Sequence, residues 1–457
     1  MPRPPVEVAD LVRAAGERFI ETSRSWLCGQ HLKVLSAISR CRTAELGGHL
    51  DECSDCGHQT AISYNSCRNR HCPKCQAGTR KRWLEARRSE LLPVRYLHVV
   101  FTLPRILSQL ALQNKKLIYS LLLTASAKTL LTVARDPRHL GAKIGFLSIL
   151  HTWNQRLQEH AHAHCVVPAG GLALDHSRWI DAPSKTFFLP KDVLAEVFRG
   201  KFVDGLRKAF AQGELGFHGR FAPLHREREF NAFVRTLYRT KWVVEVRPPF
   251  GGAERALQYL SRYTHRVAIS NQRLVSFEQN QVTFRWRDSA HSNQQRLLTL
   301  ALDEFLRRFL LHVLPSGFHR VRYYGFLTNS KRGALLPLCR RLIARVHPSR
   351  TISYSDAEPA RSGWVCPRCG GRLRVVERFT AALSRRLMLR RTQARRPWPL
   401  RREPPSCALA RCRDPFASLR LLCQKHKRSV PRLLTTPRAA SQPLRHPRKA
   451  ASLPSGL

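Results

Sequence analysis

The segment QEHAHAHCVV, residues 158–167, places three histidines at alternate positions and then continues into apolar residues. In a β-strand, side chains at i, i+2 and i+4 point to one face, so His160, His162 and His164 are expected on one surface of a sheet. The apolar continuation predicts that the strand becomes buried. Two adjacent imidazoles on one face can bind a single ion, although a polar strand edge can show the same spacing by chance. The segment therefore predicts a sheet that carries a candidate metal site.

Helical and strand patterns alternate around this segment. The sequence RYLHVVFTL (95–103) is typical of a buried strand, and residues 105–136 show helical spacing of apolar residues. Further elements are expected as helices over about 6–42, 253–264 and 303–314, strands over 160–168 and 242–247, and a hairpin of QRLVSF (272–277) with QVTFRWR (281–287). This order predicts an α+β fold, with an α/β core as the alternative.

The charge of the chain is extreme. Its 457 residues include 79 Lys and Arg against 31 Asp and Glu, a formal net charge of +48. A charge of this size indicates a polyanionic partner, and nucleic acid is the default candidate. The apolar run at residues 117–127 lies between Lys116 and Lys128 and is too short to span a bilayer. With no secretory signal pattern at the N-terminus, we expect a cytoplasmic protein with no membrane partner.

The last part of the chain differs in composition. Residues 381–457 hold 19 Lys or Arg against two acidic residues, a net charge of +17, with ten prolines and little periodicity. This composition predicts a disordered basic tail. It is explained equally well by a basic DNA-binding arm or by an unselected or frame-altered C-terminus.

A cysteine-rich block precedes the predicted sheet. Cys53-x-x-Cys56 and Cys72-x-x-Cys75 are separated by fifteen residues, the spacing of a structural four-cysteine zinc site. Several neighbours could replace one ligand: Cys67, His49, His58 and His71. Reduced thiols without metal are the alternative. The basic residues beside the block are candidates for phosphate contact: Arg68, Arg70 and Lys74.

A second Cys-x-x-Cys pair lies far downstream, at Cys366 and Cys369. This pair lacks an obvious partner pair, because the later cysteines at 407, 412 and 423 have the wrong spacing. A second zinc knuckle is therefore only a possible feature of the C-terminal extension.

Two tyrosines complete the candidate chemistry. Tyr259 and Tyr263 are four residues apart in the segment QYLSRYTHR, so on a helix both phenols point the same way. Such pairs usually pack in a core. Beside Arg262 and Arg266, in a chain with a histidine-pair strand, they also fit nucleophiles that open a phosphodiester.

These motifs, in this order, resemble a known family. HVVFTLP (98–104), HAHCVV (162–167) and YLSRYTHR (259–266), with YNSCRNRHCPKC (64–75) upstream, are similar to the two-tyrosine transposases of the insertion sequence 91 family, in the HUH endonuclease superfamily. The resemblance covers roughly residues 15 to 335 and implies an antiparallel sheet with the histidine strand in the middle and helices on its faces.

The resemblance also implies roles for single residues. His162 and His164 would bind Mg²⁺ or Mn²⁺, with Gln155 as the candidate third ligand and Glu159 behind it. Tyr259 and Tyr263 would attack DNA to form a 5′-phosphotyrosine and release a 3′-hydroxyl. The implied function is rolling-circle transposition of an insertion sequence, a DNA recombination reaction on single-stranded element ends and target DNA in the bacterial nucleoid.

The expected organisation has four parts: a helical and zinc-binding domain at 1–92, a catalytic domain at 93–335, an extension at 336–380 and the tail at 381–457. Three rivals remain. A zinc-dependent DNA-binding protein without catalysis needs no tyrosine, a tyrosine recombinase needs no metal, and a transposase with an acidic triad needs a carboxylate cluster that the sequence lacks.

Overall fold

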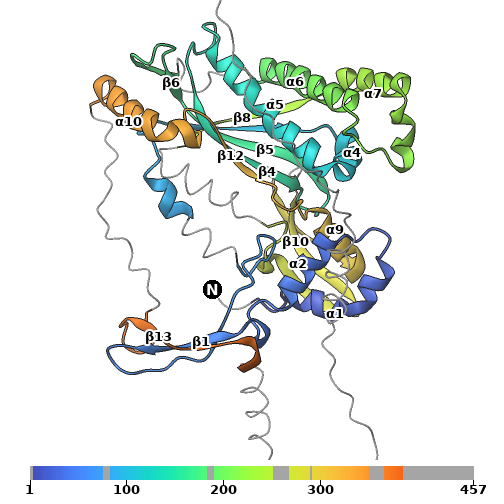
Figure 1. The fold of residues 1–457 in the computed structure, drawn as a ribbon, viewed down its shortest axis with the longest axis vertical. Coiled ribbons are helices and arrows are strands. Elements are labelled where there is room, and N and C mark those ends of the chain that lie inside the picture. Colours follow the sequence, from blue (N-terminus) through green and yellow to red (C-terminus); the bar gives the residue numbers. More distant parts are fainter. Residues whose placement is uncertain are drawn as a thin grey trace, which may run out of the picture.

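The computed structural model describes residues 4–75, 83–182, 190–250, 267–288, 291–348 and 365–383. The predicted tail beyond residue 383 and the predicted helix at 253–264 lie outside these ranges. The described elements form a large sheet with helices above it and, below it, a smaller lobe and a separate three-stranded sheet (Figure 1).

The large sheet has five strands in the order β12, β4, β5, β3, β8, and every neighbouring pair is antiparallel. The strand with the alternating histidines, β5, is therefore in the middle, as expected. The strands are β3 (Tyr96–Thr102), β4 (Gly145–Trp153), β5 (Glu159–Pro168), β8 (Val243–Phe250) and β12 (Val321–Gly325).

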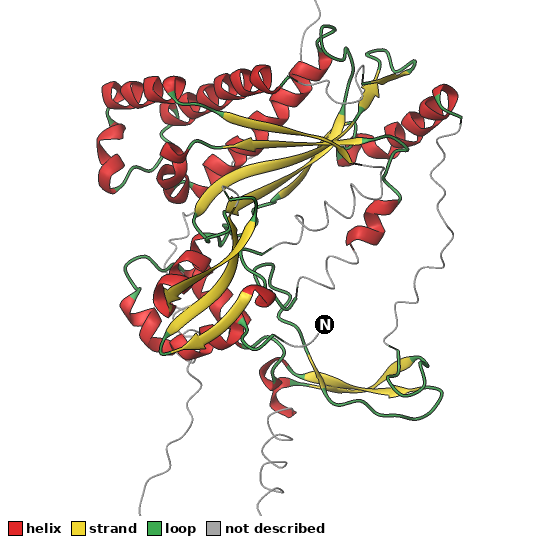
Figure 2. Ribbon diagram, turned by 180° about the vertical axis from the view of Figure 1, so that it is seen from behind, coloured by secondary structure: helices red, strands yellow, loops and turns green. Residues whose placement is uncertain are grey.

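Helices cover one face of this sheet (Figures 1 and 2). Alternate residues of β5, Ala161, Ala163 and Cys165, join the main core together with Phe101 of β3 and Phe146 of β4. The covering helices are α4 (Ser108–Gln113), α5 (Lys115–Arg135), α6 (Lys191–Ala211) and α7 (Glu227–Arg239). Helix α5 is long and apolar enough to cross a bilayer, but most of its apolar side chains are buried in this core.

The opposite face is covered over only part of its length. Val166 of β5 and Ile149 of β4 pack beneath α10 (Asn329–Val346), whose Leu342 and Ile343 are buried against them. The short strands β6 (Gly170–Leu172) and β7 (Trp179–Asp181) pair beside this region. The histidine half of the face remains open toward the smaller lobe.

The smaller lobe combines segments from both halves of the chain. Apolar residues of α1 (Val8–Thr22) and α2 (Gly29–Ser39), such as Phe19 and Leu35, share one core with Phe284 and Phe305. Besides α1 and α2, the lobe contains β9 (Leu274–Glu278), β10 (Gln281–Asp288), β11 (Gln294–Ala301) and α9 (Leu302–Leu311). Phe284 lies on β10 and Phe305 on α9. The expected boundary at residue 92 therefore crosses a continuous core.

A third, three-stranded sheet has the order β13, β1, β2. It joins β1 (Gly48–Cys53) to β2 (Ser63–Tyr64) and to β13 (Leu373–Phe379), which comes from the other end of the described chain. Residues 365–379, expected in a separate extension, thus lie against the N-terminal module.

Candidate active site and cysteine clusters

Three imidazoles meet on the open face of the large sheet. His162 and His164 follow each other on one face of β5, and His151 of β4 is the direct cross-strand partner of His162. The ligand atoms of the three rings lie within 4.8 Å of one another. The predicted pair is therefore brought together with a third histidine that our sequence reasoning missed.

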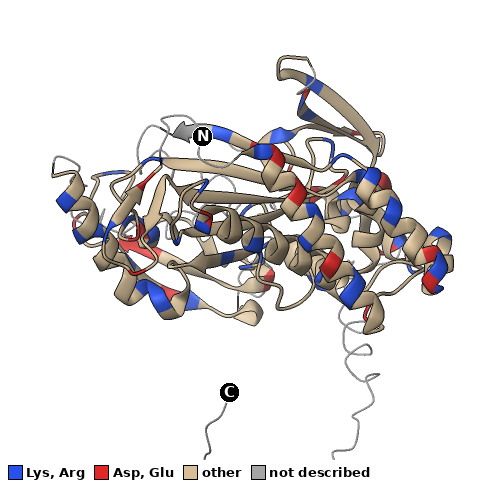
Figure 3. Cartoon of the chain, turned by 90° about the horizontal axis from the view of Figure 1, so that it is seen from above, with Lys and Arg blue, Asp and Glu red and all other residues tan. Residues whose placement is uncertain are grey.

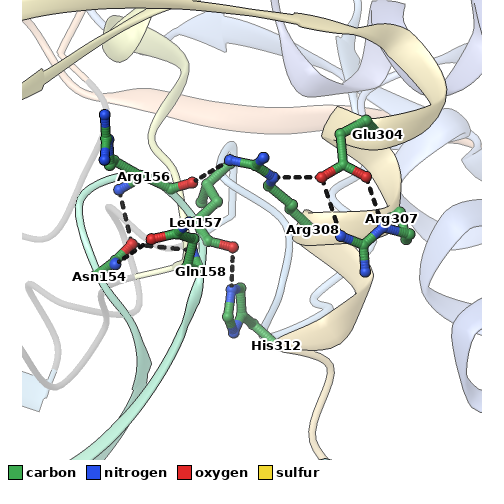
Figure 4. A network of polar contacts seen from close by, with 8 residues as sticks. All are labelled: Asn154, Arg156, Leu157, Gln158, Glu304, Arg307, Arg308 and His312. Carbon is green, nitrogen blue, oxygen red and sulfur yellow. Dashed lines mark hydrogen bonds and ion pairs between the residues drawn. The ribbon is translucent and has the colours of Figure 1, made fainter. Parts of the chain in front are cut away.

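The hairpin that joins β4 and β5 explains why these residues meet. Asn154 closes its turn, because its side-chain Oδ1 accepts hydrogen bonds from the backbone N–H groups of Arg156 and Gln158, both at 2.9 Å. The end of helix α9 holds the tip of the turn: Arg308 of the helix donates to the Arg156 carbonyl, and His312, which directly follows the helix, donates from Nε2 to the Leu157 carbonyl at 3.0 Å (Figure 4). The fixed turn pairs Trp153 with Glu159, and a β-bulge between His151 and Trp153 then shifts the register by one residue, which places His151 opposite His162.

Hydrogen bonds set the orientation of the two β5 imidazoles. His162 Nδ1 lies 2.7 Å from the carbonyl oxygen of His160, which can only accept, so Nδ1 carries the proton and Nε2 has the lone pair. His164 Nδ1 lies 2.8 Å from His98 Nε2 of β3. If Nδ1 is the donor there as well, His164 also presents Nε2 as a ligand. Metal-binding histidines commonly donate their other N–H in this way.

Burial keeps the rings of His164 and His98 neutral. Burial lowers the pKa of His164 well below its usual range, and the adjacent His151 and His162 lower it further. Burial, together with Arg247, lowers the pKa of His98 to about 3. Neutral imidazoles at pH 7 keep their lone pairs for a metal ion.

The cluster forms part of a cleft of about 430 Å³ between the large sheet and the smaller lobe. Among the described residues, its walls carry four arginines, Arg156, Arg247, Arg273 and Arg287, and one acidic residue, Glu245, which forms an ion pair with Arg247 at 3.0 Å. The Arg156 guanidinium lies 4.5 Å from the centre of the Trp286 ring. A basic cleft with an aromatic ring suits single-stranded nucleic acid, because it offers both phosphate and base contacts.

Basic residues are not confined to this cleft. Lys and Arg occur on helices and strands throughout the described chain (Figure 3). The general positive field therefore attracts DNA, whereas the cleft residues determine where a strand could lie.

The two polar residues proposed near the metal have different positions. Gln155 lies in the hairpin turn and lines the cleft. Glu159 lies on the helix-covered face, close to Ser108 and Lys115. Burial raises the pKa of its carboxyl to about 7. Glu159 is therefore on the wrong face of β5 to accompany the histidines, since odd and even positions of a strand face opposite ways.

The other candidate residues are placed as follows. Tyr259, Tyr263, Arg262 and Arg266 lie outside the described residues. Arg70 donates to the backbone carbonyls of Pro315 and Phe318, and Lys74 forms a 2.5 Å ion pair with Glu7. Both side chains thus contact other parts of the protein, and phosphate contacts by Arg70 and Lys74 stay a prediction. Arg68 is exposed.

The cysteines form two clusters. The first contains Cys41, Cys67, Cys72 and Cys75, and the second contains Cys53, Cys56, Cys366 and Cys369. Our grouping of Cys53, Cys56, Cys72 and Cys75 in a single site is therefore corrected. The reason is that β1 carries Cys53 toward β13, while Cys72 and Cys75 turn back to Cys41 at the end of α2. Cys67, considered as a substitute ligand, belongs to the first cluster.

Comparison with known proteins identifies the family. A family model described as "Putative transposase" matches residues 145–334, and one described as "Transposase zinc-binding domain", from insertion sequence 91 elements, matches residues 11–103. No solved structure matches the chain significantly.

Two curated proteins match along most of their length. "Putative transposase y4qJ" of Sinorhizobium fredii is 48% identical over 388 residues, 83% of this chain and 97% of that protein. The "Transposase for insertion sequence element IS801" of Pseudomonas savastanoi pv. phaseolicola is 26% identical over 384 residues, 82% of this chain and 87% of that protein. The family models and these relatives thus define a transposase with a zinc-binding domain. The chain belongs to the insertion sequence 91 family of transposases, which confirms the resemblance.

Proposed function

We propose that this transposase nicks and rejoins single-stranded DNA through 5′-phosphotyrosine intermediates and thereby drives rolling-circle transposition. The observation that carries the proposal is the cluster of three imidazoles in a basic cleft. We expect the protein to act on element ends and target DNA of the bacterial nucleoid.

The donor set fits a divalent ion held by His151, His162 and His164. Nitrogen donors favour a transition ion, so of Mg²⁺ and Mn²⁺ the site suits Mn²⁺ better, whereas Mg²⁺ prefers oxygen ligands. When bound, such an ion would polarise the scissile phosphate. We propose His151 as the third ligand in preference to Gln155, because its ring lies within reach of both other rings.

We propose Tyr259 and Tyr263 as the nucleophiles. Their segment joins β8, which contributes Arg247 to the cleft, to the turn that contributes Arg273. In the reaction a tyrosine oxygen bonds to phosphorus as the bond to the 3′-oxygen breaks, and the leaving oxygen becomes a 3′-hydroxyl. The phosphotyrosine conserves the bond energy for rejoining, and a second tyrosine allows a second strand to be cut before the first is released.

The test is a covalent capture experiment. A labelled single-stranded oligonucleotide spanning an element end is incubated with protein and Mn²⁺ or Mg²⁺ and analysed on a denaturing gel. We expect a metal-dependent protein–DNA adduct that is absent from the Tyr259→Phe, Tyr263→Phe double variant and retained by the control Tyr238→Phe, which changes an exposed tyrosine. An adduct that survives in the double variant would exclude these nucleophiles. If folded wild-type protein forms no adduct on a verified end, the chain is a DNA-binding protein without catalysis.

A further inference from the structure

The second cysteine cluster combines residues from the two ends of the described chain. Cys53 and Cys56 belong to the N-terminal module, whereas Cys366 and Cys369 lie more than 300 positions later. The matched zinc-binding domain ends at residue 103, so it contains only half of this cluster. We propose that these four cysteines bind a second structural zinc ion, which fastens residues 365–379 to the N-terminal module. This inference does not depend on the proposed nicking activity.

The sulfur geometry matches a tetrahedral metal site. All four Sγ atoms lie within 4.8 Å of one another, with Cys53 and Cys369 at 3.5 Å and Cys56 and Cys366 at 3.7 Å. A tetrahedron with zinc–sulfur bonds of about 2.3 Å has sulfur–sulfur edges of about 3.8 Å. A disulfide would require about 2.05 Å. The distances therefore fit four thiolates around one ion and not two disulfides.

The two Cys-x-x-Cys turns have the same backbone pattern. The N–H of Cys53 donates to the carbonyl of His58, and that of Gly57 donates to Cys53. In the second turn the N–H of Cys366 donates to Gly371, and that of Gly370 donates to Cys366. Gly57 and Gly370, each one residue after the second cysteine, have φ of +65° and +74°, which favours glycine. Two matching turns that face each other are the usual frame of a four-cysteine zinc site.

Contacts around the sulfurs agree with this assignment. Backbone N–H groups of Arg368 and Gly371 point to the Sγ atoms of Cys366 and Cys369, both at 3.4 Å. Such donors stabilise thiolates. A Cβ atom at Gly371 would lie 3.0 Å from Cys53 Sγ and 2.3 Å from Asp55 Oδ2, so the backbone approaches the cluster as closely as only glycine allows.

The same interface continues into a sheet. β1 and β13 pair from Gly48 with Phe379 to Cys53 with Leu373, and Glu52 forms an ion pair with Arg374 at 3.2 Å. The exposed ion pair contributes little, and β13 is mostly exposed. β13 is an edge strand of the three-stranded sheet, and a strand pairing that buries so little apolar surface contributes little stability on its own. The zinc would therefore supply most of the free energy that holds β13 in place.

Metal analysis of the untagged, full-length protein tests the proposal. Because the histidine cluster could also retain zinc, the readout is the difference in bound zinc from wild type. We expect Cys366→Ser, Cys369→Ser to lose one zinc per chain and Cys53→Ser, Cys56→Ser to lose one. The variant with all four changes should also lose only one. Cys28→Ser, at an exposed cysteine outside both clusters, should lose none.

Three results of the metal analysis would overturn the proposal: unchanged zinc in the Cys366→Ser, Cys369→Ser variant, a loss of two zinc ions in the fourfold variant, or iron in place of zinc in wild type. Hydrogen exchange separates loss of this site from general unfolding. Amides of residues 48–53 and 373–379 should exchange faster in the variants, while those of β3 and β5 stay protected. Unchanged exchange at 373–379 would likewise contradict a zinc-dependent attachment.

Discussion

The histidine cluster and the cysteine clusters are both metal-type sites, but they are built in opposite ways. The three histidines lie on two adjacent strands of one hairpin, and their sheet is held by a large apolar core that does not involve them. The second cysteine cluster joins segments whose other contacts are a mostly exposed strand pairing and an ion pair of Glu52 with Arg374. The histidine site is open to a cleft, whereas the cysteine sites are closed by four thiols. The difference indicates that the fold positions the histidines, whereas the cysteines position parts of the fold.

The largest effect is expected at the first cysteine cluster. Cys41 is fully buried and its Sγ lies 3.5 Å from that of Cys75. Cys41→Ser should lose one zinc and destabilise the N-terminal module by roughly 4 kcal/mol, because loss of a structural metal is among the most damaging single changes. Chemical unfolding and metal analysis, with Cys28→Ser as the control, measure this. Full stability without the zinc would show that the cluster is only a group of packed thiols.

A change at the histidine site should reduce the reaction with DNA but leave the stability of the fold unchanged. His151→Gln should reduce adduct formation by more than about 100-fold, since even residues that only orient a metal ligand typically contribute 10–100-fold. The matched variant Gln155→Ala should change it little. Thermal unfolding should remain close to wild type in both. If Gln155→Ala causes the larger loss, the third ligand is Gln155 and His151 is a packing residue.

These two sites also differ in how far the sequence could predict them. The histidine pair was predictable because strand alternation is local, and the family resemblance supplied the central position of β5. Folding the segment HTWNQRLQEHAHAH about Asn154 and Gln158 brings residue 151 beside the histidine strand, but opposite residue 161. A β-bulge between His151 and Trp153 shifts it opposite His162. The turn could be recognised from the local sequence, whereas the bulge that puts His151 on the histidine face could not.

The partners of the cysteine pairs could not be predicted in this way. All Cys-x-x-Cys turns offer the same two thiolates, so spacing alone gives no preference between Cys72 and Cys366 as the complement of Cys53. The choice is made by the pairing of β1 with β13, a contact between distant parts of the chain. Long-range pairing of this kind depends on the whole fold and leaves no local periodicity in the sequence.

A change on the other face of β5 sharpens the contrast. Glu159 has its pKa raised by burial to about 7, above its unfolded value near 4.5. The protonated carboxyl therefore contributes its full stability to the fold below about pH 4.5, and this contribution is lost as the pH rises to 7 and the carboxyl ionises. Glu159→Gln cannot ionise, so this variant should keep its stability as the pH rises. It should be more stable than wild type by about 2–3 kcal/mol at pH 8 and equally stable near pH 4. Unfolding at both pH values measures it. A loss of adduct formation in this variant would instead return Glu159 to the metal site.

The smallest expected effect concerns the strand that would lie in the cleft. Trp286→Ala should weaken binding of single-stranded DNA by about 1–2 kcal/mol, because one aromatic ring stacks about one base and Arg156 already covers part of this ring. Trp286→Phe should restore most of the affinity.

Fluorescence anisotropy over a range of salt concentrations separates stacking from charge. The slope of log K against log salt concentration should stay at the wild-type value in Trp286→Ala, whereas Arg287→Ala should reduce the magnitude of this slope by about 0.7 for one lost phosphate contact. Equal slopes in all three variants would mean that the DNA strand does not lie in this cleft. DNA would then not reach the histidines through the cleft.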